Sequence, residues 1–108
     1  MEPEALEDWE RGLRPPRPLP RPFTMHWGSG QITEEAAYSG EYHQPSIQLL
    51  EYIGGPAAGS FSVRFCYYSH DGRFQRSPMM LGDEDIEGLR EALAYAPKLR
   101  AILRRLVE

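Results

Sequence analysis

The chain has 108 residues, of which 41% are hydrophobic and 26% are charged, and its formal net charge is −4 at pH 7. A chain of this length can form one small domain that buries only about two-thirds of its unfolded surface, so dimerisation would help its stability. The acidic balance argues against a uniformly basic nucleic-acid binder, although a local basic patch could still contact phosphates.

The cysteine count and the hydropathy pattern predict where the protein resides. Cys66 is the single cysteine, which excludes an internal disulfide and a cysteine cage for zinc or an iron–sulfur cluster. No run approaches the roughly 20 apolar residues of a membrane span, and the amino terminus is acidic, unlike a signal peptide. We expect a soluble intracellular protein, cytoplasmic or in a nucleoid or nucleus, with no membrane partner.

Residues 1–22 predict a disordered arm ahead of a single α+β domain over 23–108. The arm consists of an acidic decapeptide, MEPEALEDWE, and an arginine–proline stretch, RGLRPPRPLPRP. The prolines remove backbone donors and favour an extended backbone, so we expect a solvated tail or spacer. A complete Arg-x-x-Pro-x-x-Pro motif for an SH3-type domain is not formed.

The next segment predicts two strands. FTMHW, residues 23–27, alternates apolar and polar residues and predicts a short strand. Residues 31–42 are open between one or two helical turns and a loop, because Thr33 and the residues after it suit a capped helix. Alternation then predicts a strand over 45–53, followed by the flexible connection GGPAAG.

Residues 61–81 predict a β-hairpin that turns at Asp71-Gly72. A two-residue type I′ turn places His70 opposite Arg73. One face then collects apolar side chains that predict the core: Phe61, Val63, Phe65, Tyr67, Phe74, Pro78 and Met80. The other face collects Ser62, Arg64, Cys66, Tyr68, Arg73, Gln75, Ser77 and Met79. A three-residue loop would slip this register by one.

The carboxy-terminal residues predict helix. Asp83 suits an N-cap, and apolar residues recur at helical spacing through residue 96. Pro97 predicts a kink or the start of a second helix, which carries the apolar stripe Leu99, Ile102, Leu103, Leu106 and Val107. We expect the apolar side of the 83–96 helix to cover the apolar face of the hairpin.

The polar face of the hairpin suggests a binding surface. It carries Arg64, Tyr68 and Arg73, and the preceding strand adds Tyr52. Aromatic rings stack on single-stranded bases at about 1–3 kcal/mol each, and arginines bind phosphates. The alternative is an ordinary solvated face, since antiparallel sheets commonly expose one side.

Catalysis, cofactors and metals are not predicted. His26, His43 and His70 are scattered without metal-ligand spacing. Cys66 could neighbour Arg64, which would favour a thiolate, but no base is identifiable for it. GGPAAG lacks the Gly-Lys-Ser/Thr of a nucleotide loop.

VRFCYYSHDGRFQRSPMML, running directly into GDEDIEGLREALAYAPKLRAILRRL, resembles the positive cofactor four family of single-stranded-DNA-binding transcriptional coactivators. The resemblance covers residues 60–108. It implies a curved four-stranded antiparallel sheet followed by a helix, a homodimer formed through that helix, and binding of single strands along the sheet. The implied contacts are Arg64, Tyr68, Arg73 and Arg76.

Two functions are therefore expected. The preferred one is noncatalytic binding of single-stranded nucleic acid, with a role in transcription, through Arg64, Tyr68, Arg73, Arg76 and Tyr52. The alternative is a small protein-interaction module that uses the carboxy-terminal helix stripe and the arginine–proline arm.

Overall fold

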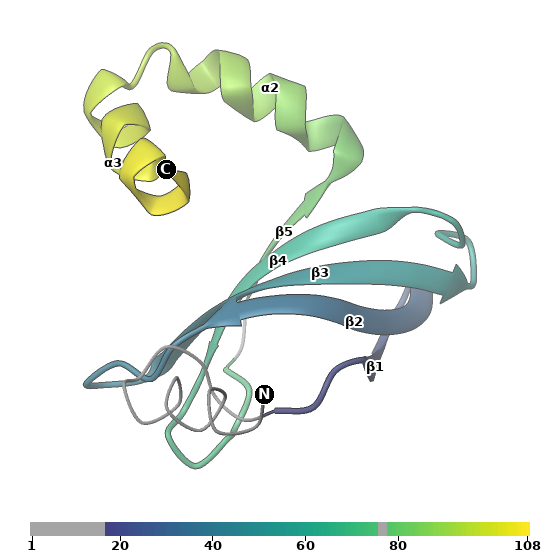
Figure 1. Ribbon diagram of the computed structural model, residues 1–108. Helices are drawn as coiled ribbons and strands as arrows, with labels where there is room; N and C mark the ends of the chain where they lie inside the picture. Colours follow the sequence, from purple (N-terminus) through teal and green to yellow (C-terminus); the bar gives the residue numbers. More distant parts are fainter. Residues whose placement is uncertain (1–16, 76–77) are drawn as a thin grey trace.

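Five antiparallel strands, each hydrogen-bonded to the next in the chain, form an open meander sheet that leads into two helices (Figure 1). The structure is a computed structural model that describes residues 17–75 and 78–108. The strands are β1 (Arg21–Met25), β2 (Gly28–Ala37), β3 (Gln44–Gly54), β4 (Phe61–Tyr68) and β5 (Met79–Gly82). The predicted α+β class with an antiparallel sheet is confirmed, with five strands in place of four.

β2 occupies residues 31–37 of the segment 31–42 that the sequence left open between helix and loop, and neither alternative is right there, whereas residues 38–42 form a loop. Its pairing with β3 outweighs the helical preference of Thr-Glu-Glu-Ala-Ala. The register shifts between Ser29 and Gly30 and again between Ile32 and Glu34. Such irregularities bend the strand. At Gly30 the backbones approach so closely that a Cβ would lie 1.9 Å from a backbone oxygen of β3.

The predicted two-residue turn of the hairpin is wrong by one residue. Ser69 and Arg73 are joined by a backbone hydrogen bond, so the loop holds three residues, 70–72, and Gly72 adopts a φ of 88°. Tyr68 therefore opposes Phe74. The slip moves the Phe74 side chain onto the face of Arg64 and Tyr68, where its ring packs against both.

The helices are α2 (Asp83–Leu93) and α3 (Pro97–Val107), so the predicted break at Pro97 is confirmed. α2 begins directly where β5 ends. Its N-cap is Gly82, one residue before the predicted Asp83, and the Gly82 amide donates to the Asp85 carboxylate at 3.0 Å. Acidic residues fill the first turn of α2, where they meet the positive end of the helix.

The face predicted to be polar and solvated is the buried one, which we call the enclosed face. At one end Phe23, Ile32, Leu50 and Tyr52 form the buried apolar cluster, with the Phe23 and Tyr52 rings edge to face at 5.0 Å. At the other end the buried side chains all carry polar groups: Gln44, Ser46, Gln48, Arg64 and Tyr68. The predicted core face is therefore wrong.

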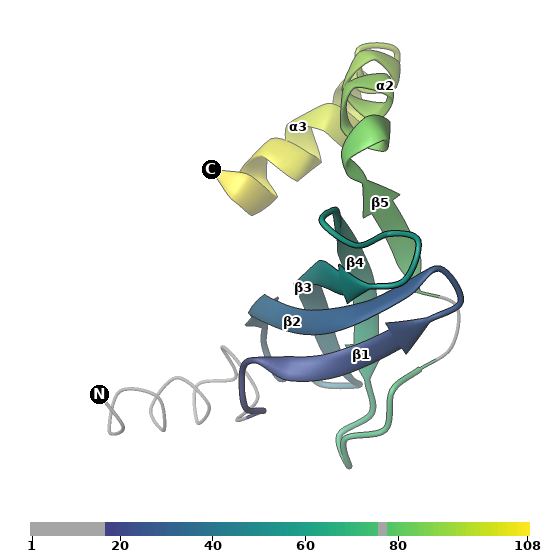
Figure 2. The same cartoon turned by 90° about the vertical axis from the view of Figure 1, so that its right-hand side faces the viewer.

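The opposite side, which we call the open face, carries Phe61, Val63, Phe65 and Tyr67 of the predicted core, whereas Met80 pairs with Arg64 and packs against the buried cluster of the enclosed face. Eight apolar residues lie on the open face. Six are half-buried and two are exposed: Ile47, Leu49, Phe61, Val63, Phe65 and Leu81, then Ile53 and Tyr67. α2 leaves the sheet at β5 and α3 turns back, both on this side (Figures 1 and 2). Both helices lie wholly in the described part of the chain and neither has a buried residue. The prediction that the apolar side of the 83–96 helix covers this face is therefore wrong for the single chain described here.

The predicted boundary between arm and domain falls inside β1. Residues 1–16 of the arm lie outside the described residues. Arg21 and Pro22 belong to β1, and the Arg17 side chain donates to Gln44 at 2.9 Å. The end of the arginine–proline stretch thus contacts the enclosed face.

Candidate interaction surfaces

Glu35 is the centre of the polar half of the enclosed face. Its side chain is 5% exposed, and Arg21 donates to both carboxylate oxygens at 2.9 and 3.1 Å. Ser46 and Gln48 add hydrogen bonds of 2.6 and 2.9 Å. Burial is the largest influence and raises the Glu35 pKa, but these hydrogen bonds and the Arg21 charge outweigh it and lower the pKa to about 2. Glu35 is therefore an ionised carboxylate at neutral pH.

Gln48 connects Glu35 to the two remaining charged and aromatic groups of this face. Its amide nitrogen also donates to the Tyr68 hydroxyl at 2.9 Å, and its oxygen accepts from Arg64 Nε at 2.8 Å. Arg21 reaches the same Tyr68 hydroxyl at 3.2 Å. The Arg17 guanidinium lies 3.9 Å from the centre of the Tyr68 ring. Two buried nitrogens of Arg17, Nε and Nη2, lack a hydrogen-bond partner among the described residues. The bonds of Glu35, Gln48 and Tyr68 nevertheless connect β1, β2, β3 and β4 in one buried polar network.

The sequence-predicted binding residues fall in three places. Arg64 and Tyr68 are brought together through Gln48 but are only 8% and 7% exposed, and Arg64 is covered by the Phe74 ring at 4.7 Å. Tyr52 lies in the apolar cluster, where its hydroxyl bonds Trp27 and Ser62. Arg73 is exposed in the hairpin and pairs with Asp71 at 3.7 Å. Arg76 lies outside the described residues.

Sequence reasoning missed the residues that organise this network: Glu35, Arg17, Arg21 and Ser46. Arg17 and Arg21 were assigned to the arm, and Glu35 to a segment of undecided structure. The signal that could have found them is the polar run of alternate residues at the start of β3, Gln44, Ser46 and Gln48. Alternation on one strand predicts a polar face opposite an apolar one.

Cys66 does not have the reactivity that a neighbouring arginine would give it. Burial raises the pKa of its thiol and is the largest influence, exceeding the opposing effect of the Arg64 charge. The thiol is half-buried and protonated at neutral pH. A thiolate favoured by the neighbouring Arg64, one of the two possibilities that the sequence left open, is therefore not formed.

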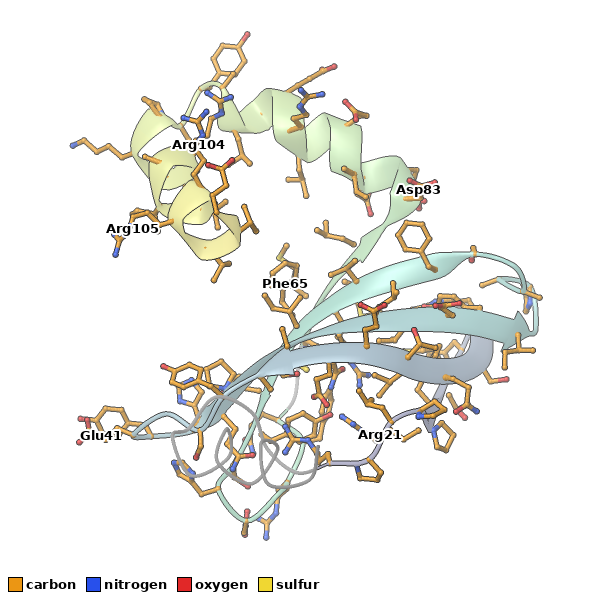
Figure 3. The ribbon with its side chains drawn as sticks, viewed as in Figure 1. Arg21, Glu41, Phe65, Asp83, Arg104 and Arg105 are labelled. Carbon is orange, nitrogen blue, oxygen red and sulfur yellow. The ribbon has the colours of Figure 1, made fainter. Side chains whose placement is uncertain are left out.

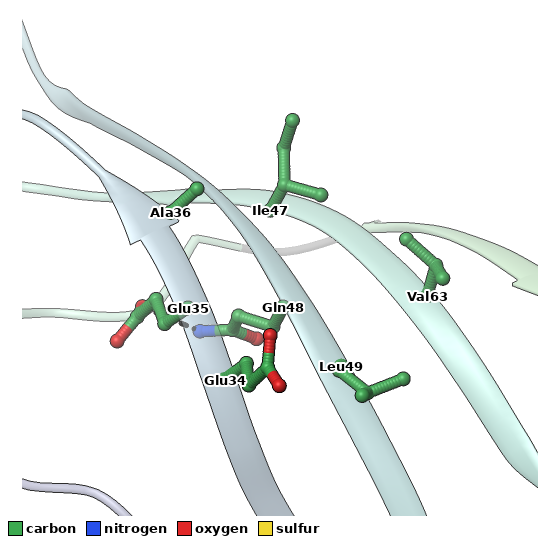
Figure 4. Close-up of a pocket in the computed structure, with 7 residues that line it drawn as sticks. All are labelled: Glu34, Glu35, Ala36, Ile47, Gln48, Leu49 and Val63. Atoms are coloured by element: carbon green, nitrogen blue, oxygen red, sulfur yellow. Dashed lines mark hydrogen bonds between the residues drawn. The ribbon is translucent and has the colours of Figure 1, made fainter. Parts of the chain in front are cut away.

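The open face contains a shallow hollow across its middle strands. Ala36, Ile47, Leu49 and Val63 line it, and Glu34 stands beside them. In Figure 4, Ala36, Ile47 and Val63 lie on one side of the sheet, while the Glu35–Gln48 hydrogen bond lies toward the other. A second hollow, where β5 meets α2, is lined by Met79, Leu81, Leu89 and others. Both hollows are mainly apolar and open to solvent.

The helices present a second apolar surface toward the same space. On α2 the exposed apolar residues are Ile86 and Leu89. On α3 they are Leu99, Ile102, Leu103, Leu106 and Val107. Figure 3 shows Phe65 projecting from β4 toward α3, with Arg21 on the opposite side of the sheet. α3 is also cationic, since Lys98, Arg100, Arg104 and Arg105 surround its stripe. One chain therefore holds two apolar surfaces on the same side of the sheet, a mostly half-buried one on the open face and an exposed one on the helices.

Neither helix of residues 17–75 and 78–108 is long and apolar enough to cross a membrane. Over the same residues, His, Cys, Asp and Glu do not gather in groups of three or more that could hold a metal ion. The chain matches no model of a known protein family, no curated protein and no solved structure.

Proposed function

We propose that this protein is a noncatalytic protein-interaction module whose binding surface consists of the open face and the stripe of α3. The observation that carries the proposal is the exposure of both surfaces on the same side of one sheet. Isolated exposed apolar residues are ordinary, but contiguous patches beyond a few hundred Å² mark interaction sites. A partner protein that covers them would remove this apolar surface from water.

Site-specific photo-crosslinking in the producing cells tests the proposal. A photoreactive amino acid at Leu103 lies in the α3 stripe, and the same group at Ala101 lies on the opposite side of the helix. We expect covalent protein adducts from position 103 and few from position 101. Equal labelling at both positions, or no adduct at either, would contradict the proposal.

A second candidate function is the binding of single-stranded nucleic acid, and the exposed cations favour it. Arg73 is 79% exposed, and the four cations of α3 are exposed as well. Such groups contact phosphates in a salt-dependent way. Base stacking on Tyr68 or Tyr52 would need the enclosed face to open first, because both rings are buried. A titration with labelled single-stranded DNA at two salt concentrations tests this function, and an absence of binding at low salt would refute it.

A further inference from the structure

We infer that the acidic decapeptide (residues 1–10) docks on the stripe of α3 in its own chain, where it competes with a partner protein. The inference rests on the proposed function, because it concerns the same surface, and it adds a means of regulating that surface. The stripe consists of exposed apolar side chains. A docked segment would keep them out of water while no partner is bound.

α3 carries cations along both edges of its apolar stripe. At about 3.6 residues per turn, Lys98 and Arg105 lie along one edge. Arg100 and Arg104 lie along the other edge. All four are exposed, and among residues 17–75 and 78–108 none of them forms an ion pair. The helix itself contains no acidic residue. A segment that fits α3 therefore needs apolar residues between two acidic edges.

The acidic decapeptide, MEPEALEDWE, has this pattern in its sequence. Leu6 and Trp9 are three residues apart, so a helical turn would place them on one side. Asp8 would then lie along one edge of this pair, and Glu7 and Glu10 along the other. A helix this short is marginal in water, but packing against another helix would stabilise it. The chain thus contains a segment with the chemistry that the stripe of α3 requires.

The charges of α2 and of the open face direct an acidic segment to α3. α2 has five acidic residues and one arginine, and that arginine, Arg90, already lies 3.6 Å from Glu87. The acids of the open face are Glu34 and Glu51, both exposed. Like charges on α2 and on the sheet repel the decapeptide, whereas the four cations of α3 attract it. Such complementarity selects the binding surface more than it adds affinity.

The described chain begins near the end of the sheet over which α3 stands. Arg17 donates to Gln44, the first residue of β3. Phe65, which projects toward α3, pairs with Ile47, three residues farther along β3 (Figure 3). Residues 11–16, which separate the decapeptide from Arg17, can span about 20 Å. Packed layers lie about 10 Å apart, so this linker is long enough to pass round the end of the sheet.

A short linker makes weak docking effective. Linkers of a few residues give effective concentrations in the millimolar range, and an intrinsic dissociation constant of about 0.1 mM would then leave about 90% of the chains docked. A competing ligand would bind only the remaining fraction. Its apparent affinity would therefore fall about tenfold.

Photo-crosslinking of the purified full chain tests the contact directly. A photoreactive amino acid at Leu103 should link α3 to the decapeptide, whereas the same group at Ala101, on the opposite side of the helix, should not. Trypsin cleaves after Arg11, Arg100 and Arg104, so both positions are read in the same two peptides, 1–11 and 101–104. A mixture of isotope-labelled and unlabelled chains shows whether the linked peptides come from one chain.

A labelled synthetic decapeptide tests whether the surface is already occupied. The full-length variant Leu6→Ser/Trp9→Ser loses the apolar contacts of its own decapeptide, so it should bind the added peptide about tenfold more tightly than wild type does. Adding Leu103→Glu/Leu106→Glu to this variant should abolish peptide binding, whereas adding Ala101→Glu should not. The α3 substitutions alter no buried residue, and circular dichroism checks that the fold is kept.

Three outcomes overturn the inference. They are the absence of a link between peptides 1–11 and 101–104 from position 103, links that join two different chains, and equal peptide affinity for wild type and Leu6→Ser/Trp9→Ser. A wild type without the intrachain link whose position 103 crosslinks other proteins in cells would leave the proposed function standing. An intrachain link without any adduct in cells would end the proposed function alone, and the absence of both would end both.

Discussion

Replacing Glu35 by glutamine tests whether an ionised carboxylate holds the enclosed face together. The side chain keeps its size, but the charge that Arg21 contacts at 2.9 Å is lost. Arg21 would remain largely buried beside a neutral amide, and removing one partner of such an ion pair is costly. The burial and the hydrogen bonds of Glu35 shift its pKa, and the size of this shift gives the contribution of the carboxylate to the free energy of unfolding.

The pKa of Glu35 falls from an ordinary value of 4.5 to about 2 in the folded chain. Because the folded pKa is the lower one, the carboxylate stabilises the fold above pH 4.5, and this stability is lost as the pH falls toward 2. At 1.36 kcal/mol per pKa unit, the contribution at pH 7 is about 3 kcal/mol. A small domain has a total stability of only about 5–15 kcal/mol, so the effect should be large.

Urea unfolding at a series of pH values from 7 to 2 measures this contribution. Wild type should lose about 3 kcal/mol more than Glu35→Gln over this range, since the variant lacks the titrating group. Glu91→Gln removes the same charge from an exposed position on α2 and should follow the wild-type curve. Parallel curves for wild type and Glu35→Gln would refute the role assigned to this carboxylate.

Three further predictions address the backbone, the thiol and the second candidate function. Gly30→Ala should lower the free energy of unfolding by about 3 kcal/mol, because its Cβ would strike a β3 carbonyl. Gly88→Ala, in the open middle of α2, should instead raise the free energy of unfolding by about 1 kcal/mol. Thermal melts of both variants test these two values. Cys66 should react with iodoacetamide more slowly than a free cysteine at pH 8 and gain rate at higher pH, because burial raises the pKa of its thiol; equal rates would contradict this. If single-stranded DNA binds, Arg73→Ala should reduce the slope of log binding constant against log salt concentration by about one, because Arg73 is exposed. Arg64→Ala should mainly lower the melting temperature, because Arg64 belongs to the buried network. A reduced slope for Arg64→Ala and an unchanged slope for Arg73→Ala would place DNA on the enclosed face.

Local sequence patterns predicted much of the fold. Alternation placed a strand over 45–53, close to β3, and Pro97 ended one helix and began another because it lacks the backbone donor. β2 was not predictable in the same way, because its residues favour a helix in isolation and become a strand only when β3 lies beside them. That pairing is a contact between distant parts of the chain.

The faces of the sheet were the part that the sequence could not assign. Alternation shows which residues share a face, but it does not show which face is enclosed, and the usual choice is the apolar one. Here Glu35 and Gln48 satisfy Arg21, Arg64 and Tyr68 in a buried network. Arg21 lies 14 residues before Glu35, so no local sequence pattern indicates that the two side chains form an ion pair.

The separation of a polar enclosed face from an apolar open face has a consequence for sequence variation. Substitutions at Gln48 or Arg64 should lower the yield of folded protein, since they disturb groups that the monomer needs. Substitutions at Ile53 or Leu106 should leave the yield unchanged and affect only association, since both side chains face water in the monomer. A library scored separately for abundance and for partner binding would therefore divide its damaging variants by the side of the sheet on which they fall. Two selection pressures would act on the same strands at alternate positions.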